Sequence, residues 1–168
     1  FIDSTKISGG KFKFQGKFEV PRYCTINIYL DPNDRQTRSK IINFSLFIDS
    51  TAVEATCNYS GKHPVFQISG SGTQTEYQNY LSEIQPMEDD RSKTFHAYGE
   101  AYYSTKDLAK AIDLAKLVTE KRLAIREAKM KYLKAHPESA ISVKIAQELS
   151  DRNSDLSLKE IEGLFTSL

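Results

Sequence analysis

The sequence has almost no net charge and no long hydrophobic segment. Its 23 basic and 22 acidic residues leave a formal net charge of +1, so no strong field favours nucleic acid or an acidic membrane surface. No apolar run approaches the roughly 18 residues that a membrane-spanning helix needs. We therefore expect no nucleic-acid partner and no transmembrane segment.

Common catalytic motifs are absent as well. The sequence contains no G-x-S-x-G motif, no P-loop and no G-x-G-x-x-G motif. Its three histidines, His63, His96 and His136, lie far apart and lack the spacing of a metal site. We expect no catalytic, cofactor-binding or metal-binding residue here. A hydrolase would need His63 or His96 beside a carboxylate in a cleft, and a metal site assembled from distant residues stays open.

Cysteine is scarce, with only Cys24 and Cys57 and no C-x-x-C. Both fall on the apolar faces of expected strands, which favours two buried thiols that act as small hydrophobic residues. An even number of cysteines also permits a disulfide. A reactive thiol would need a cationic, partly exposed setting, and neither cysteine has a basic cluster adjacent to it. Without C-x-x-C, we expect no disulfide-reductase activity.

The first 70 residues alternate between apolar and polar side chains, which is the period of a strand. The pattern predicts six short strands near 2–7, 11–15, 22–30, 41–48, 53–58 and 65–69. Gly9-Gly10 is typical of a hairpin turn, and polar loops are expected at 31–40 and 60–64. Short strands with frequent turns favour an antiparallel sandwich or open barrel.

The period changes at Gly70-Ser71-Gly72, after which apolar residues recur every third or fourth position. Thr73 or Thr75 can cap a helix through its side-chain oxygen. The glycine-rich turn before a helix could also hold an anion on its backbone N–H groups, although a simple turn from sheet to helix explains it better. We therefore place the boundary here, with an antiparallel β domain at 1–72 and a helical region at 73–168.

The helical region is expected to contain several segments. The first helix should end near Pro86, and a second should run from Met87 to Tyr102. A third should span Thr105–Ala135, which lacks glycine and proline and would be roughly 45 Å long. Its central charges favour a solvated face over a binding site. Ser139 and Ser157 are expected to cap two shorter helices.

Two apolar sets are candidate ligand or interaction surfaces. Tyr23, Tyr29 and Phe47 lie on the polar faces of their strands, where they could bind a ligand or receive the helices. The last helix carries Leu164, Phe165 and Leu168, which could bind a partner or fold back on residues 139–149.

Several motifs, taken in order, resemble one family. They are Ile2-Asp3-Ser4-Thr5 with the following Gly-Lys-Phe-Lys-Phe-Gln-Gly of 10–16, Ile-Ser-Gly-Ser of 68–71 with Thr-Gln-Thr-Glu-Tyr of 73–77, His-Pro-Glu-Ser of 136–139, and Leu-Ser of 156–157. This order is similar to the N-terminal domain, of unknown function, of the thioredoxin-like thiol-disulfide oxidoreductases common in Bacteroidetes.

The resemblance implies a role beside a redox domain. In that family a downstream thioredoxin-like domain carries C-x-x-C, so no catalytic residue carries over to this chain. The implied function is a non-catalytic accessory or interaction module that positions the redox domain or recognises partners, including an envelope protein. The implied location is the periplasm or a membrane-anchored position in the cell envelope, and no cofactor is implied. Because the sequence begins at Phe1, we expect an excised or processed chain. The alternative function is a β-sandwich module that binds a small molecule, glycan or peptide.

Overall fold

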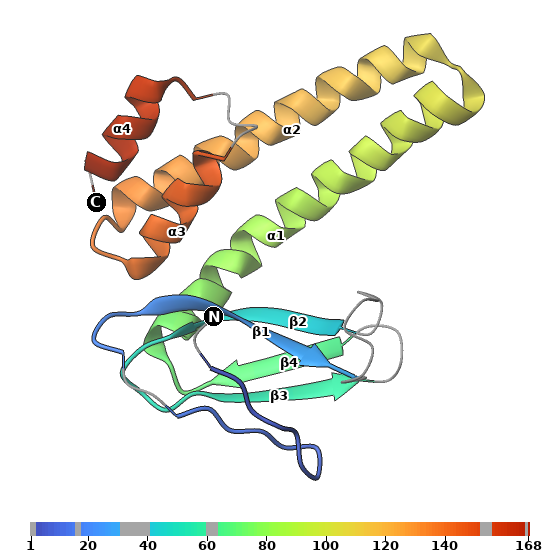
Figure 1. Cartoon of the computed structure of the whole chain (residues 1–168). Coiled ribbons are helices and arrows are strands. Elements are labelled where there is room, and N and C mark those ends of the chain that lie inside the picture. The colour runs from blue at the N-terminus through green and yellow to red at the C-terminus, as the bar shows by residue number, and fades with distance from the viewer. Residues whose placement is uncertain (1–2, 16–17, 31–40, 60–63, 152–155, 167) are drawn as a thin grey trace. The chain divides into compact units, whose positions relative to one another are not determined.

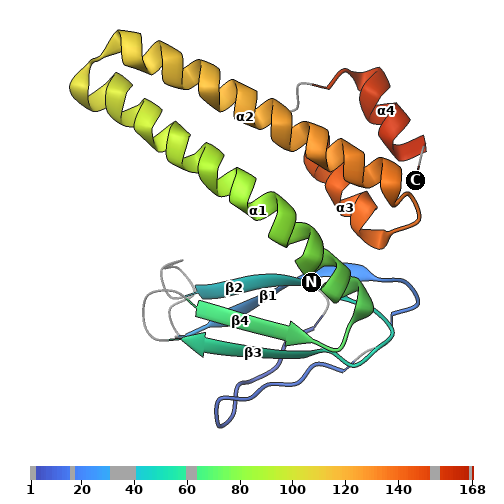
Figure 2. The same cartoon turned by 180° about the vertical axis from the view of Figure 1, so that it is seen from behind.

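The chain divides into two compact units, Phe1–Gln74 and Thr75–Leu168. The structure is a computed structural model that describes residues 3–15, 18–30, 41–59, 64–151, 156–166 and 168. Strands lie in the first unit and helices dominate the second (Figures 1 and 2). The predicted α+β class, with antiparallel strands followed by helices, is confirmed.

The first unit contains two antiparallel hairpins. Strand β1 (Arg22–Tyr29) pairs with β2 (Ile41–Ile48), and β3 (Glu54–Tyr59) pairs with β4 (Pro64–Ser69). Among the described residues these form two separate two-stranded sheets. Phe44 of β2 stacks on Phe66 of β4 with ring centroids 4.2 Å apart, so aromatic packing joins the hairpins.

The N-terminal segment differs from the sequence-based prediction. Ser8 and Lys11 form an isolated bridge across Gly9-Gly10, whose positive φ angles confirm the predicted turn. The strands predicted at 2–7 and 11–15 are wrong over the described residues, which form no further ladder. These residues are mostly exposed, and alternation alone cannot make a strand that has no partner. The antiparallel sandwich stays a prediction, and the loop predicted at 31–40 lies outside the described residues.

Helix α1 (Gly72–Gly99) begins at a polar junction with the end of β2. Ser71 is the cap, because its Oγ accepts the Gln74 N–H at 3.0 Å, and the predicted caps Thr73 and Thr75 are therefore wrong. The Gln74 side chain accepts the Phe47 N–H at 2.7 Å, which ties the first turn of the helix to β2. Gly70 approaches Ala52 so closely that an added Cβ would lie 2.1 Å from the Ala52 carbonyl oxygen.

Asp49 organises the same junction. Its Oδ2 accepts the Ser71 hydroxyl at 2.6 Å and faces the Thr73 N–H at 3.4 Å, while its Oδ1 accepts the Thr51 N–H at 2.8 Å. These hydrogen bonds from Ser71 and Thr51 hold the pKa of Asp49 well below its usual range. The anion at the start of α1 is thus the chain's own carboxylate, placed where the helix dipole favours negative charge.

In the second unit, α1 and α2 (Leu108–Ala135) form an antiparallel hairpin (Figures 1 and 2). The predicted break at Pro86 is wrong, because α1 continues through it to Gly99. Packing of its buried Tyr80 and Ile84 opposes the cost of the hydrogen bond that proline removes. A π-helix, η2 (Glu100–Thr105), follows and ends where Lys106 adopts a left-handed conformation.

Two short helices pack beside α2. Helix α3 (Ala140–Leu149) is capped by Ser139 as predicted, and Ile141, Ile145 and Ala146 are fully buried. Helix α4 (Leu158–Thr166) begins with the predicted capping box, in which Ser157 and Glu160 exchange hydrogen bonds. Within the described part of the chain, no helix combines the length and the apolar character that crossing a membrane requires.

Gly70 should tolerate no side chain. Gly70→Ala places a Cβ against the Ala52 carbonyl and forces a φ of +101° on alanine, so we expect the first unit to lose at least about 2 kcal/mol of unfolding free energy. Urea denaturation followed by amide signals of β2 and β4 measures the loss. In Gly72→Ala, the matched control, the new Cβ meets no atom within 4 Å, so its stability should change by less than about 1 kcal/mol. Equal stability of the two variants would contradict this account.

Asp49 should stabilise the first unit in a pH-dependent way. We expect Asp49→Asn to cost about 1.5–3 kcal/mol at pH 7, because the hydrogen bonds from Ser71 and Thr51 lose their charged acceptor. The native pKa is lowered, so the carboxylate's contribution is complete above its unfolded pKa of about 4 and is lost as pH falls toward the native value. Urea titrations at pH 7 and pH 3 should show a smaller difference between wild type and variant at pH 3. A difference that does not change with pH would refute this role for the charge.

Candidate functional site

An open groove of about 1040 Å³ lies in the first unit between the N-terminal segment and β1. Two stretches and two phenylalanines line it: residues 4–7, residues 26–30, Phe12 and Phe14. The Phe12 and Phe14 rings meet edge to face, with centroids 5.7 Å apart. The groove therefore combines an aromatic pair with the aliphatic side of a strand.

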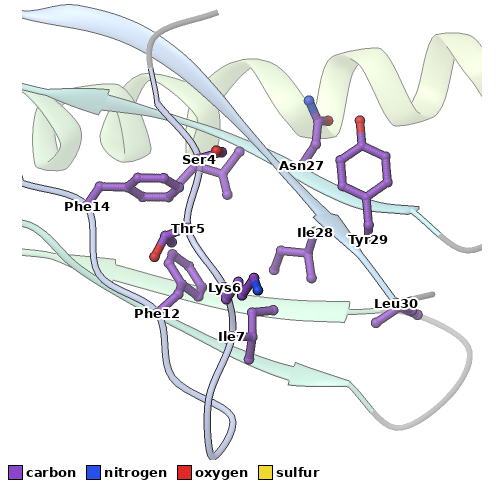
Figure 3. A pocket seen from close by; sticks show the side chains of 11 residues that line it. Ser4, Thr5, Lys6, Ile7, Phe12, Phe14, Asn27, Ile28, Tyr29 and Leu30 are labelled. Atoms are coloured by element: carbon purple, nitrogen blue, oxygen red, sulfur yellow. The ribbon is translucent and has the colours of Figure 1, made fainter. Parts of the chain in front are cut away.

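Apolar side chains face the groove from both of its walls. Ile28 points toward Ile7 across it, while Asn27 and Tyr29 project from the other side of β1 (Figure 3). Ile7 and Phe14 are 49% and 40% exposed, which leaves apolar surface open to a ligand. Lys6 is the one charged side chain among the described residues of the lining.

Strand β1 adds backbone groups to this site. Among the described residues it pairs only with β2, so beside the groove, at residues 26–29, its second edge carries N–H and C=O groups available for hydrogen bonding. An apolar groove beside an unpaired strand edge can accept an extended peptide or a flat apolar ligand. Among the residues that the structure describes, the lining of the groove holds no carboxylate.

The three aromatic residues proposed from the sequence are only partly brought together. Tyr23 and Phe47 face each other across β1 and β2, with ring centroids 5.1 Å apart. Phe47 is only 2% exposed, so it belongs to the core, whereas Tyr23 and Tyr29 are exposed. Tyr29 lies near the opposite end of β1 and borders the groove. Sequence reasoning did not assign Phe12, Phe14 or Ile28 to a site, although the Phe-Lys-Phe alternation was a usable signal.

The apolar residues of α4 point in different directions. Leu164 is buried at 6% exposure, whereas Leu158 and Phe165 are 85% and 45% exposed. Leu168, after the helix, is half-buried. Glu160 lies 3.8 Å from Arg126 of α2, which links α4 to that helix. One face of α4 thus packs within the second unit while another remains open.

A polar cluster ties α1, α2 and the start of α3 together. Glu76 Oε1 accepts hydrogen bonds from the Tyr132 and Ser139 hydroxyls, each at 2.8 Å. Burial and the neighbouring Glu76 carboxylate raise the pKa of Tyr132 to about 12. Each member has a structural partner, so this cluster is an internal tie between helices.

The hydroxyl group of Tyr80, unlike the groups of that cluster, lacks a hydrogen bond within the part of the chain that is described. Its hydroxyl is buried and has no hydrogen-bond partner among the described residues. Burial raises the pKa of Tyr80, and the nearby Glu148 and Glu88 carboxylates raise it further. The hydroxyl therefore stays protonated and is not poised for acid–base chemistry at neutral pH.

The described cysteines and histidines lie on different elements of the chain. Both cysteines are free thiols, and Cys57 is exposed, so the prediction of two buried thiols is wrong for Cys57. Cys24 is half-buried, and burial raises its thiol pKa. His96 is exposed on α1, His136 is exposed at the C-cap of α2, and His63 lies outside the described residues. No group of three or more potential metal ligands occurs in the part of the chain that the structure describes.

Comparison with known proteins adds one family match. Residues 1–77 match the model of the family described as "Domain of unknown function (DUF4369)", which covers the strand-containing unit and the start of α1. No curated protein and no solved structure matches the chain. The groove therefore lies in the part of the chain that is similar to a family whose function is not known.

Proposed function

We propose that this chain is a non-catalytic accessory module of an exported thiol-disulfide oxidoreductase, where it positions the redox domain or recognises its partners. The observation that carries the proposal is the open face of α4. Leu158 and Phe165 are 85% and 45% exposed on a nine-residue helix that is already anchored by the buried Leu164. A helix that packs through one face and exposes apolar side chains on the other can bind a second domain or protein through the exposed face.

Burial of that face would release useful free energy. Complete burial of a leucine or phenylalanine side chain contributes about 1.5–3 kcal/mol relative to exposure. When the docking domain belongs to the same polypeptide, the effective concentration is high, so a small interface suffices. The occupant that we assign is the downstream thioredoxin-like domain implied by the family resemblance, with an envelope protein as the further partner. The same resemblance supports a periplasmic or membrane-anchored location.

Docking on α4 should appear as protection from hydrogen exchange in the full-length parent. We expect amides of residues 158–166 to exchange at least about tenfold more slowly in the parent than in this chain alone, which corresponds to about 1.4 kcal/mol. Leu158→Gln combined with Phe165→Gln should remove the difference. Leu108→Gln is the matched control, since Leu108 is 60% exposed on α2. Equal exchange rates in the parent and in this chain would rule out docking on α4.

The groove of the first unit supports a second function, that of a module that binds a small molecule, glycan or peptide. Its volume of about 1040 Å³, its phenylalanine pair and its unpaired strand edge are the specific observations in favour. Aromatic rings offer large contact areas at low entropic cost, and a strand edge adds main-chain hydrogen bonds. This function does not depend on α4.

Binding in the groove can be tested with two probes, cellohexaose and the peptide acetyl-Thr-Val-Thr-Val-Thr-Val-amide. We expect one of them to shift amide signals of residues 4–7 and 26–30, and Phe12→Ala with Phe14→Ala to weaken its binding by about tenfold or more. Phe95→Ala is the control, because Phe95 is 53% exposed on α1. Absence of shifts with both probes, or equal binding by the double variant, would count against the groove as a binding site.

A further inference from the structure

A second cavity, of about 460 Å³, lies in the helical unit between the C-terminal half of α2 and α4. Its lining comes from both helices and from two flanking residues: Arg126, Met130, Leu133, Lys134, Pro137, Leu156, Glu160, Gly163 and Leu164. This volume falls within the roughly 300–1,000 Å³ of small-molecule sites. Neither the family match nor the proposed docking face of α4 accounts for it.

The interior of the cavity is apolar. Leu133 and Leu164 are 4% and 6% exposed, and Met130 is half-buried between the two helices. Gly163 contributes no side chain, and a Cβ built there would meet no atom within 4 Å. A flexible methionine and a glycine leave space that an apolar chain can fill.

The rim carries two cations and one carboxylate. Glu160 Oε2 accepts the Ser157 N–H at 2.8 Å and the Ser157 hydroxyl at 2.7 Å, and its Oε1 lies 3.8 Å from Arg126. The Ser157 hydrogen bonds, with a smaller contribution from Arg126, lower the pKa of Glu160, which keeps it ionised. The Glu160 carboxylate is therefore already bound by Ser157 of the helix cap and by Arg126.

Lys134 is the charged residue of this cavity whose charge is not balanced by a described residue of opposite charge. It is exposed, and it has no hydrogen bond or ion pair among the described residues. It stands eight residues after Arg126 on α2, a rise of roughly 12 Å, with Met130 and Leu133 between them. An apolar channel with a single unpaired cation at one end complements a molecule that has one anionic head and an apolar body.

We propose that this cavity binds a small anionic amphiphile of the fatty-acid type, with its carboxylate on Lys134 and its chain along Met130, Leu133 and Leu164. A bare inorganic anion would leave the apolar walls unused, and a cationic amphiphile would be repelled by Lys134. The site is independent of the proposed docking function, which uses Leu158 and Phe165. Failure of one therefore leaves the other standing.

The test uses decanoate below its micellar concentration and decyltrimethylammonium, which has the same chain and the opposite charge. Calorimetry should detect decanoate binding, with shifts at the amides of residues 126–137 and 156–164, and binding of the cation should be at least about tenfold weaker. Lys134→Gln should weaken decanoate binding by about five- to tenfold. Lys131→Gln, an exposed lysine of α2 outside the cavity, should leave it unchanged.

A filling variant separates the cavity from the general charge of α2. Gly163→Leu should place its side chain in the cavity and abolish decanoate binding, and unchanged helical circular dichroism would show that α4 still forms. Equal binding of the two amphiphiles, equal effects of Lys134→Gln and Lys131→Gln, or undiminished binding by folded Gly163→Leu would each overturn the proposal. If Gly163→Leu fails to fold, the comparison of the two lysine variants decides alone.

Discussion

The hydrogen bonds to the Asp49 carboxylate are the constraint on which the first unit depends. They join the turn after β2 to the first turn of α1, where Ser71 and Thr73 supply the donors. Gln74 completes the junction by accepting the Phe47 N–H. The end of β2 is thereby fixed, β2 holds β1 in register, and β1 forms one wall of the groove. A charged acceptor outside the lining of the groove thus helps to maintain the geometry of one of its walls.

Sequence patterns correctly predicted the features that depend only on neighbouring residues, such as strands, a tight turn and helix caps. Alternation located the four strands that the described residues form, the Gly9-Gly10 turn was visible as a dipeptide, and Ser139 and Ser157 were identifiable caps. Alternation failed for residues 3–7 and 11–15, because it reports which face a side chain occupies and not whether a partner strand exists. The cap of α1 was missed for a related reason. The sequence offers several hydroxyls near Gly70, and Asp49, 22 residues from Ser71, decides among them.

Candidate surfaces were harder to predict than helices and strands, because a cavity is lined by segments that lie far apart in the sequence. Phe12 and Ile28 line one groove although a turn and most of a strand separate them in sequence. The sequence analysis placed Leu164 and Phe165 in one candidate surface, yet these neighbours have opposite environments. Only the packing of α4 within its unit assigns one to the interior and the other to the surface. Pro86 shows the same limit, since tertiary packing outweighs a local helix-breaking signal.

The strongly perturbed ionisable groups of the described residues lie at positions that hold the fold together. Catalytic sites characteristically bring such groups into a cleft. In the described part of this chain, Asp49, Tyr80 and Tyr132 have strongly shifted pKa values, and none of them lines either cavity. Asp49 and Tyr132 are held by hydrogen bonds that join elements, while Tyr80 is shielded by burial. Glu160 does border a cavity, but its shift arises mainly from its own helix cap. The binding that we propose for the two cavities therefore relies on their shape, on their apolar side chains and, in the second cavity, on Lys134.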